Sequence, residues 1–522
     1  MSHVDAEDAR ALALSLRRMY NAVAEKIEEE NAASPLVEKV TGHLGCPLGD
    51  VVIVEEKYRL YEHAGLQTAA DLYLRAHSPD ARWFGVVGGE RTWQSMMNML
   101  LGAMKDGSVL LGRPAYGSAP TGPDRFLEVV QLGMVATAAP DGSPVIVGLS
   151  SKDEFDSCCM LTVYAAERSA AVTVREEIDR LKREHDPFRG QVLSFGVSEH
   201  RDNEIVSFLP RPELGPEEVV LPDGRLEAIE DHIVGIAEEA DRLRESGQHL
   251  RRGLLLYGPP GTGKTHTTRY LIGRLRECTV LVMTGPAMRV IGQAVALARR
   301  LQPSMVVIED VDLIAEDRGH YETSPLLFSL LDAMDGIAGD ADVTFVLTTN
   351  RVEVLEKALV QRPGRVDLAM EIPLPDRRAR ERLMRLYARE RPIEADLGKV
   401  VDATEGVTAS FIKELLRRVV LIAIRADQHV LRDEHFDAAL QAMSGAGQAL
   451  TRALLGAREN GTGSGGVHSG EPGYGEAAPQ PGPAQPAQPA PDADSAMGGD
   501  DGQAPSGPKD TRMPARLLPP TC

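Results

Sequence analysis

A glycine-rich octapeptide constrains this chain more than any other feature of its sequence. Residues 258–265 read Gly-Pro-Pro-Gly-Thr-Gly-Lys-Thr and fit the pattern G-x-x-x-x-G-K-[ST]. The apolar run at residues 253–257 predicts a buried strand before it, and residues 266–274 predict a helix after it. Glycines let the backbone wrap around phosphate groups with its N–H groups pointing inward, and a helix N-terminus adds a favourable dipole. The segment therefore predicts an α/β core that binds a phosphate chain.

The loop and the residue after it are the expected nucleotide-binding residues. Lys264 is expected to reach the β- and γ-phosphates of ATP, and the Thr265 hydroxyl is expected to bind Mg²⁺. ATP and Mg²⁺ are therefore the expected cofactors. The full set of expected nucleotide-binding residues is Gly258, Pro259, Pro260, Gly261, Thr262, Gly263, Lys264, Thr265 and His266.

A second apolar run ends in two carboxylates. Ser304–Ile308 predicts a strand, and Glu309 and Asp310 follow it directly. An acidic pair in this position is often only the solvated end of a strand. Here the pair follows the phosphate loop at the sequence spacing at which proteins with such a loop carry the acidic residues of their metal site. The pair is therefore interpreted as part of the nucleotide site.

Residues 225–450 resemble the AAA-type ATPase module. The string Arg252–Thr265 is similar to the family's Walker A segment, and three further segments follow in the family's order. They are the sensor-1 segment Thr348-Thr349-Asn350, the arginine-finger segment Arg362-Pro363-Gly364-Arg365-Val366-Asp367, and the start of the sensor-2 helix, Thr404-Glu405-Gly406-Val407-Thr408-Ala409-Ser410. The resemblance does not extend to residues 1–210 or to the C-terminal tail.

The sequence predicts an α/β fold in several parts, and the resemblance covers the two parts between residues 225 and 450. Residues 225–372 would form a P-loop AAA+ module, a parallel sheet flanked by helices, and residues 373–450 a small helical lid. An α+β region at residues 1–210 would precede it and recognise a protein target or adaptor, with a linker at residues 211–224. Residues 456–522 are rich in Gly, Pro and Ala and are expected to be disordered, because they cannot bury enough apolar surface to offset the entropy of ordering.

The resemblance also implies catalytic roles for three residues. Asn350 would orient the attacking water or contact the γ-phosphate, and Arg362 and Arg365 would reach the ATP of a neighbouring subunit. A site shared in this way forms only on assembly. The implied partner is therefore the chain itself, in a homo-oligomeric ring that is a hexamer as in the family.

The Walker B acids depart from the family's pattern, in which Asp precedes Glu. Here Glu309 would hold Mg²⁺ through a water molecule and Asp310 would activate the attacking water. A similar order, and a segment similar to residues 331–336, occurs in the subfamily of the mitochondrial Rieske-protein translocase. Because Asp is one methylene shorter than Glu, activation of the water is expected to be slower unless the backbone compensates.

Two further motifs of the wider family are missing from the sequence. The segment that would form the pore loop, Val290-Ile291-Gly292, carries no aromatic residue, which disfavours processive threading of a polypeptide. The sequence also contains no His-Glu-x-x-His segment, so the zinc protease attached to some AAA proteins is not expected.

Residues 5–30 predict an amphipathic helix at the start of the chain. Its apolar side chains recur at spacings of three and four residues: Leu12, Leu16, Met19, Val23 and Ile27. Two interpretations remain open at this stage. The helix either packs on its own domain or forms a short coiled coil between subunits.

Composition narrows the class of protein. The formal net charge is −20, which disfavours binding to a nucleic-acid backbone. The five cysteines are too few for a disulfide framework and form no Cys-x-x-Cys pair, which favours the cytoplasm. No apolar run approaches the ~18 residues of a membrane span, and the first residues lack the pattern of a signal peptide.

The sequence thus predicts a cytoplasmic, Mg²⁺-dependent AAA ATPase that hydrolyses ATP to remodel a protein or protein complex. Two alternatives remain open. One is a nucleic-acid motor or loader of the wider AAA+ class. The other is a scaffold that binds ATP but hydrolyses it very slowly.

Overall fold

The computed structural model divides the chain into two compact units, residues 1–459 and residues 460–522. All described residues belong to the first unit: residues 10, 13–23, 26, 34–88, 96–105, 109–152, 158–197, 204–312, 325–336, 339–352 and 365–444. The expected disordered tail at residues 456–522 lies outside the described residues. No helix among the described residues is both long and apolar enough to cross a membrane.

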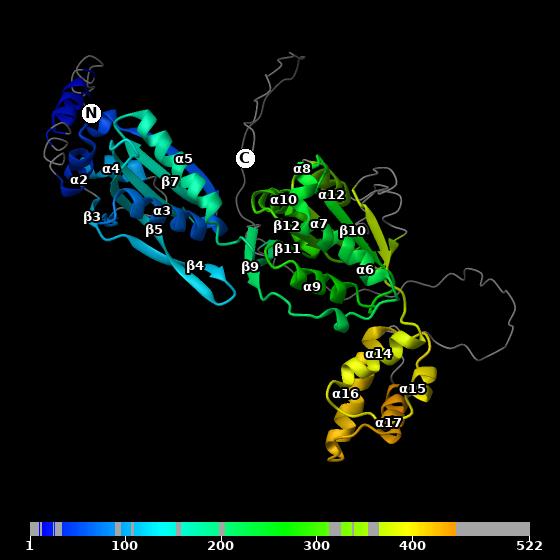
Figure 1. Cartoon of the computed structure of the whole chain (residues 1–522). Helices are drawn as coiled ribbons and strands as arrows, with labels where there is room; N and C mark the ends of the chain where they lie inside the picture. The colour runs from blue at the N-terminus through cyan, green and yellow to red at the C-terminus, as the bar shows by residue number, and fades with distance from the viewer. Residues whose placement is uncertain are drawn as a thin grey trace, which may run out of the picture. The chain divides into compact units, whose positions relative to one another are not determined.

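An antiparallel five-stranded sheet forms the centre of the N-terminal domain (Figure 1). Its strands run in the order β1–β7–β6–β5–β4, and their bounds are Val52–Arg59, Cys158–Ala165, Pro144–Lys152, Arg125–Ala138 and Ala115–Gly122. A short separate pair, β2 (Gly85–Val87) and β3 (Leu110–Gly112), lies beside it. Strands β5 and β6 form a hairpin, and at its turn the Ala139 N–H donates to Ser143 O over 2.8 Å.

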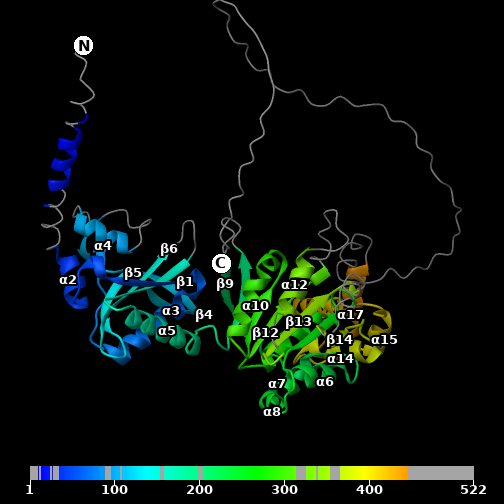
Figure 2. The ribbon, with the colours of Figure 1, turned by 90° about the horizontal axis from the view of Figure 1, so that it is seen from above.

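Alternating side chains of this sheet build two cores on its two faces. The ribbon in Figure 2 shows helices on both sides of the sheet. Val145 and Val147 of β6 face helices α3 and α5, whereas Ile146 between them faces α2 and α4. The bounds of these four helices are His63–His77, Arg168–Glu184, Pro35–Leu44 and Met96–Lys105. The first of them follows β1 through a 3-10 turn, Leu60–Glu62.

The second sheet has seven strands and carries the phosphate loop. Its order is β14–β10–β13–β12–β11–β8–β9, with bounds Leu368–Glu371, Arg252–Tyr257, Val343–Thr349, Ser304–Ile308, Thr279–Met283, Val192–Val197 and Glu204–Leu209. All neighbouring strands are parallel except β8 and β9. Every residue of β12 and β13 is buried, as a parallel sheet covered on both faces requires.

Helices cover both faces of this sheet. One face packs against α10 (Ile291–Arg300) and α12 (Pro325–Asp335). The other packs against α9 (Lys264–Arg274) and against α6 (Arg225–Glu230) with the π-helical turn η4 (Asp231–Gly235). Short helices α7 (Ile236–Glu238) and α8 (Ala240–Glu245) follow η4. The described residues therefore confirm a mixed α/β fold with a parallel sheet.

The edge of this sheet comes from the region that the sequence assigned to the N-terminal domain. Strand β8 pairs with β11 in parallel, and β9 pairs with β8, although both lie before the expected boundary at residue 210. The first residue of the expected linker at residues 211–224 packs against the second sheet and its helices. The Arg211 guanidinium donates to four backbone carbonyl oxygens, those of Gly190, Ile272, Leu275 and Cys278, over 2.5–3.0 Å.

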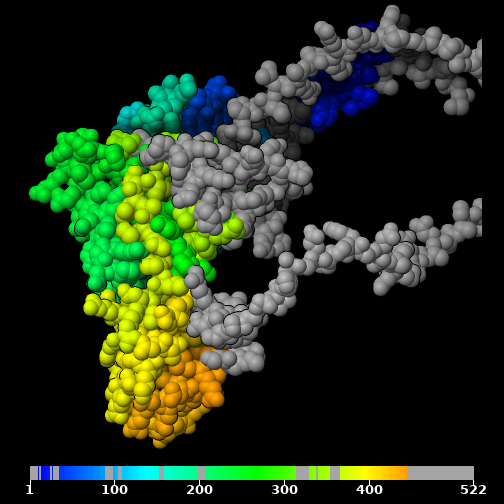
Figure 3. All heavy atoms as spheres, turned by 90° about the vertical axis from the view of Figure 1, so that its right-hand side faces the viewer, coloured from blue at the N-terminus to red at the C-terminus, as the bar shows by residue number. Residues whose placement is uncertain are grey.

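Among the described residues, four helices follow β14 and share one apolar core. This part of the surface is coloured yellow to orange in Figure 3. They are α14 (Arg377–Ala388), α15 (Leu397–Ala403), α16 (Ala409–Arg425) and α17 (Asp433–Ser444). Asp376 begins the first of them by accepting a hydrogen bond from the Ala379 N–H over 2.7 Å, and Thr408 caps the third in the same manner.

The chain is helical over residues 13–23, within the helix predicted at residues 5–30. Three residues of its apolar stripe, Leu16, Met19 and Val23, are 52%, 62% and 54% exposed. Leu12 and Ile27 lie outside the described residues. The described part of the stripe does not pack against the domain.

Candidate nucleotide site

A cleft of about 420 Å³ opens at the carboxyl ends of β10, β12 and β13. Its described lining comes from the phosphate loop, from the loops after the two other strands and from the start of α16: Pro260, Gly261, Gly263, Lys264, Thr265, His266, Arg269, Asp310, Asn350 and Ser410. Open parallel sheets bind ligands at this edge. The cleft therefore joins the predicted phosphate loop to one Walker B acid and to the sensor-1 asparagine.

The phosphate loop adopts a backbone that only glycine tolerates at two places. Gly258 has φ 141°, and a Cβ atom there would lie 2.3 Å from the carbonyl oxygen of Ile372. Gly263 has φ 118° and directly precedes the first residue of α9. The loop therefore bends sharply out of β10 and delivers the N-terminus of α9 to the cleft.

Lys264 is the first residue of α9 and is almost fully buried. Its Nζ donates to the carbonyl oxygens of Gly258 and Pro259 over 2.8 and 2.9 Å. Burial lowers the pKa of Lys264, and the nearby carboxylates of Asp310 and Asp312 oppose that shift. The lysine thus lies beneath the loop with its ammonium held by the same backbone that would surround a phosphate.

Asp310 and Asn350 meet across the cleft. The Asn350 Nδ2 donates to Asp310 Oδ1 over 3.2 Å, and the Asp310 N–H donates to the Thr348 hydroxyl over 3.1 Å. Asp310 has φ 52°, a left-handed backbone that turns its side chain out of the line of β12. Glu309 is half-buried, and the described lining of the cleft includes Asp310 but not Glu309.

A buried carboxylate behind the cleft was not among the predicted site residues. Asp312 is 5% exposed, and its Oδ1 accepts hydrogen bonds from the Thr349 hydroxyl at 2.9 Å and from the Asn350 N–H at 3.2 Å. It therefore ties the end of the sensor-1 strand to the segment after Walker B. The sequence signal was an acid two residues beyond the Walker B pair, but its partners could not be read from spacing.

The start of α16 reaches the phosphate loop. The Ser410 N–H donates to Gly261 O over 3.0 Å, and Ser410 lines the cleft. His266 lies at the opposite end of the loop, where its Nε2 is 3.0 Å from Glu218 O. Arg269, one turn further along α9, is exposed and also lines the cleft. The sequence did not single out Ser410 or Arg269 as site residues.

Of the two predicted arginine fingers, only Arg365 is described, and Arg362 lies outside the described residues. Arg365 is 8% exposed, and its Nε donates to Asp335 Oδ1 of the same chain over 2.6 Å. Burial lowers its pKa, and Asp332 opposes that shift. Arg365 therefore forms an ion pair with Asp335 of its own chain, and it is not part of the described lining of the cleft.

A larger cavity of about 860 Å³ lies between α14 and α16 of the helical domain. Its described lining shares only Ser410 with the nucleotide cleft and includes no residue of the phosphate loop. Volume alone therefore does not identify the site. The glycine backbone, the buried lysine and the carboxylate opposite it distinguish the smaller cleft.

Comparisons with known proteins agree with this geometry. The family described as "ATPase family associated with various cellular activities (AAA)" matches residues 254–374. The ATP-dependent zinc metalloprotease FtsH 3 of Sphaerobacter thermophilus is 32% identical over 239 residues, 43% of this chain and 48% of the relative. The proteasome-activating nucleotidase of Methanopyrus kandleri is 29% identical over 336 residues, 60% of this chain and 73% of the relative.

A third relative is the 26S proteasome regulatory subunit 6A of Schizosaccharomyces pombe, 29% identical over 229 residues. These cover 41% of this chain and 52% of that subunit. The chain thus spans about half the length of the FtsH 3 and 26S relatives.

Proposed function

The chain carries an ATPase domain of the AAA family, and from this premise we propose that the protein hydrolyses ATP with Mg²⁺ to remodel a protein target. The observation that carries the proposal is the cleft that joins Lys264, Asp310 and Asn350 at one edge of the sheet. Phosphoryl transfer needs positioned charges more than covalent chemistry. A buried cation, a carboxylate and an amide around a glycine-rich loop are such charges.

The residues of the cleft fit ATP. The Lys264 ammonium donates to two loop carbonyls, which phosphate oxygens would replace as its partners. The cleft volume of about 420 Å³ lies within the usual range of small-molecule sites. His266 and the backbone at Glu218 bound the loop on the side away from Asp310 and would hold the remainder of the nucleotide.

The residues also fit Mg²⁺ held mainly by phosphate and water. No group of three or more His, Cys, Asp or Glu side chains in the described parts of the chain forms a metal site by itself. Mg²⁺ in nucleotide sites uses one or two protein oxygens together with phosphate oxygens and water. Thr265, exposed at the start of α9, would supply the hydroxyl, and Glu309 would act through a water molecule. The bound ion would neutralise charge that develops on the phosphates.

Asp310 is proposed as the group that accepts the proton of the attacking water. It lines the cleft, and Asn350 donates to its Oδ1, so the two side chains lie close enough together to contact the same water in the cleft. The Glu309-Asp310 order also supports a likeness to the subfamily of the mitochondrial Rieske-protein translocase. That likeness concerns the site and not a substrate.

Arg362 and Arg365 are proposed to complete the site of a neighbouring copy in a homo-oligomeric ring, as a hexamer. The ion pair between Arg365 and Asp335 favours different roles for the two arginines. Arg365 would hold the segment in place, and Arg362 would reach the neighbour's γ-phosphate. The N-terminal domain would recognise the target or adaptor, and the cytoplasm is the proposed location.

Three variants of the full chain test the ATPase proposal. Lys264→Ala should lose ATP binding, Asp310→Asn should bind ATP but not hydrolyse it, and Glu309→Gln should weaken the dependence on Mg²⁺. Binding is measured by calorimetry and turnover by phosphate release. An unchanged affinity in Lys264→Ala refutes the nucleotide cleft. Normal hydrolysis in Asp310→Asn, with ATP bound but not hydrolysed in Glu309→Gln, would show that Glu309 and not Asp310 activates the attacking water.

The same assay separates a second candidate function, an ATP-dependent scaffold with very slow hydrolysis. The observation that favours it is the short side chain of Asp310 in the position expected for the water-activating acid. ATP binding without phosphate release by the wild type would establish it. The other alternative, a nucleic-acid motor, is disfavoured by the net charge of −20.

A further inference from the structure

The N-terminal domain meets the ATPase domain at the start of the Walker B strand. Helix α10 ends at Arg300, three residues follow, and β12 begins at Ser304 and leads to Glu309 and Asp310. This turn therefore sets the position of the strand that carries both acids.

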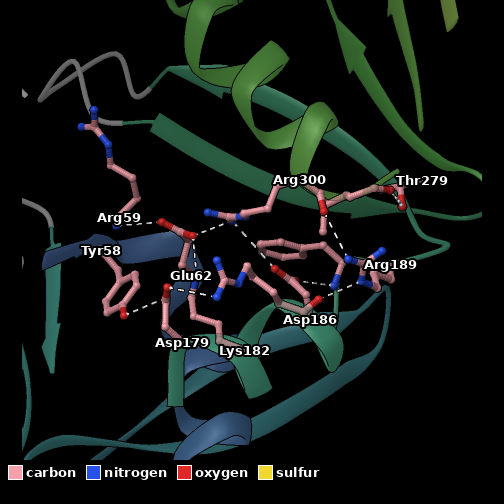
Figure 4. A network of polar contacts seen from close by, with 12 residues as sticks. Tyr58, Arg59, Glu62, Asp179, Lys182, Asp186, Arg189, Thr279 and Arg300 are labelled. Atoms are coloured by element: carbon pink, nitrogen blue, oxygen red, sulfur yellow. Dashed lines mark hydrogen bonds and ion pairs between the residues drawn. The ribbon is translucent and has the colours of Figure 1, made fainter. Parts of the chain in front are cut away.

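A cluster of buried charges joins Arg300 to the N-terminal domain (Figure 4). Arg300 Nη2 lies 2.5 Å from Glu62 Oε1 and 3.8 Å from Asp186 Oδ2. Lys182 Nζ of α5 donates to the same Glu62 oxygen over 2.7 Å, and its exposed side-chain fraction is 3%. Burial raises the pKa of Glu62, but Lys182 and Arg300 outweigh it and hold the pKa below its usual value.

Arg189 donates hydrogen bonds to the backbone of the turn between α10 and β12. It follows the N-terminal domain's α5 and donates through Nη2 to Arg300 O over 3.2 Å and through Nη1 to Gln302 O over 3.1 Å. Arg300 is the last residue of α10 and Gln302 lies in the turn after it, so the guanidinium lies at the C-terminus of the helix, where the helix dipole favours cations. Arg189 Nε donates to Arg183 O at 3.0 Å, so one guanidinium connects the end of α5 to the end of α10.

Further contacts continue this connection into the sheet. The Gly190 N–H donates to the Thr279 hydroxyl over 3.0 Å, and that hydroxyl donates to Leu301 O over 3.1 Å. On the apolar side, Tyr61 of the N-terminal domain packs edge-on against Phe195 of β8 with ring centroids 5.8 Å apart. Polar and apolar contacts thus fix the same junction.

We propose that the N-terminal domain is a positioning element of the ATPase site. Through Arg189 and Arg300 it holds the turn before β12, and the position of this strand places Glu309 and Asp310. Binding of a target to the N-terminal domain would then change hydrolysis through α10 and β12, without a separate signalling loop. The proposal rests on the proposed ATPase function for its kinetic consequence but not for its structural one.

Substitutions on α10 provide a matched test. Arg300→Ala removes the ion pair to Glu62, and Arg299→Ala removes the neighbouring arginine, which is exposed. Arg189→Ala removes the contact to the turn by a different residue. Arg300→Lys keeps a cation on a shorter side chain, so it should restore only part of the attraction that Arg300 Nη2 exerts on Glu62 and Asp186.

The first measurement is hydrogen exchange of the full chain without nucleotide. Arg300→Ala and Arg189→Ala should speed exchange about 2- to 30-fold in residues 186–191 and 300–308, with Arg300→Lys between them and the wild type. Arg299→Ala should exchange like the wild type. Equal exchange in Arg300→Ala, Arg189→Ala and Arg299→Ala overturns the proposal even if the wild type hydrolyses no ATP.

The second measurement is steady-state hydrolysis of ATP. Arg300→Ala should lower kcat by about 2- to 30-fold and leave KM for ATP near the wild-type value, because the phosphate loop is untouched. Arg300→Lys should recover part of kcat. Faster exchange with an unchanged kcat in an active enzyme would show a structural contact that does not position the site, and would also overturn the proposal. A wild type that releases no phosphate contradicts the proposed function instead, and exchange then decides alone.

Discussion

The hydrogen bond between Thr349 and Asp312 offers a sharp test of how the site is held. Thr349 is fully buried, its hydroxyl donates to Asp312 Oδ1 over 2.9 Å, and the next residue, Asn350, donates its N–H to the same oxygen. Thr349→Val keeps the shape of the side chain and removes the hydroxyl. The Asp312 carboxylate then keeps only the hydrogen bond from the Asn350 N–H. The backbone next to Asn350 loses the hydrogen bond between the Thr349 side chain and Asp312.

The size of the effect follows from the charge of the acceptor. A hydrogen bond to a charged group contributes about 1.5–3 kcal/mol, and about 1.4 kcal/mol corresponds to a factor of ten in rate. If the whole cost falls on the transition state, kcat drops by roughly 10- to 150-fold. KM for ATP should stay near the wild-type value, because Lys264 and the phosphate loop are unchanged. Thr349→Ser, which keeps the hydroxyl, should recover most of the activity.

The same strand contains a matched control. Thr344 of β13 is 1% exposed, and its Oγ1 has no hydrogen-bond partner among the described residues. Thr344→Val therefore removes a buried hydroxyl that makes no bond, and should raise the free energy of unfolding by about 1 kcal/mol without changing kcat. Thermal unfolding and steady-state kinetics are measured on both variants. The reasoning is refuted if the two substitutions change kcat alike, or if Thr349→Val raises KM and leaves kcat unchanged.

Two further predictions concern assembly and acid stability. Arg362→Ala should bind ATP but lose hydrolysis by about 10³–10⁵-fold, and mixing it with Asp310→Asn after subunit exchange should restore activity; no recovery at any ratio contradicts a shared site. In the helical domain, hydrogen bonds from Arg417 and Arg418 lower the pKa of Glu414 from 4.5 to about 2. Its contribution to stability is thus present above pH 4.5 and lost as the pH falls towards 2, so Glu414→Gln should flatten the unfolding curve in that window; an unchanged slope would contradict this assignment.

The sequence predicted the parts of the site that depend on local pattern. Strand β10, the phosphate loop and helix α9 are continuous in the chain, and each has a signal of its own in the residues 253–274. Strand β12 was likewise visible as an apolar run with two acids after it, and Asn350, which follows β13, was found through the sensor-1 resemblance. Their meeting at one edge followed from the rule that parallel strands share a direction.

Contacts between distant segments could not be predicted in this way. Strand β8 has the same apolar pattern whether it pairs within the N-terminal sheet or with β11, and only tertiary packing decides between them. The ion pair between Glu62 and Arg300 joins residues that are far apart in the chain, and either residue alone reads as a solvated surface charge. The boundary at residue 210 was placed at a proline-rich segment, whereas Arg211 there donates to three carbonyls of the ATPase domain and to that of Gly190.

Two junctions connect the ATPase domain to its neighbours, one beside the nucleotide cleft and one at the opposite end of β12, and they constrain how ATP would act on a target. At one, the Ser410 N–H donates to Gly261 O and links the helical domain to the phosphate loop. At the other, Arg189 and Arg300 link the N-terminal domain to the turn before β12. A bound phosphate that draws Lys264 away from the carbonyl of Gly258 would change the conformation of the phosphate loop, which contacts the first junction. A shift of Asp310 would move β12, the strand that begins at the second junction. By reciprocity, a target that displaces the N-terminal domain must alter nucleotide affinity by the same factor by which the nucleotide alters affinity for the target.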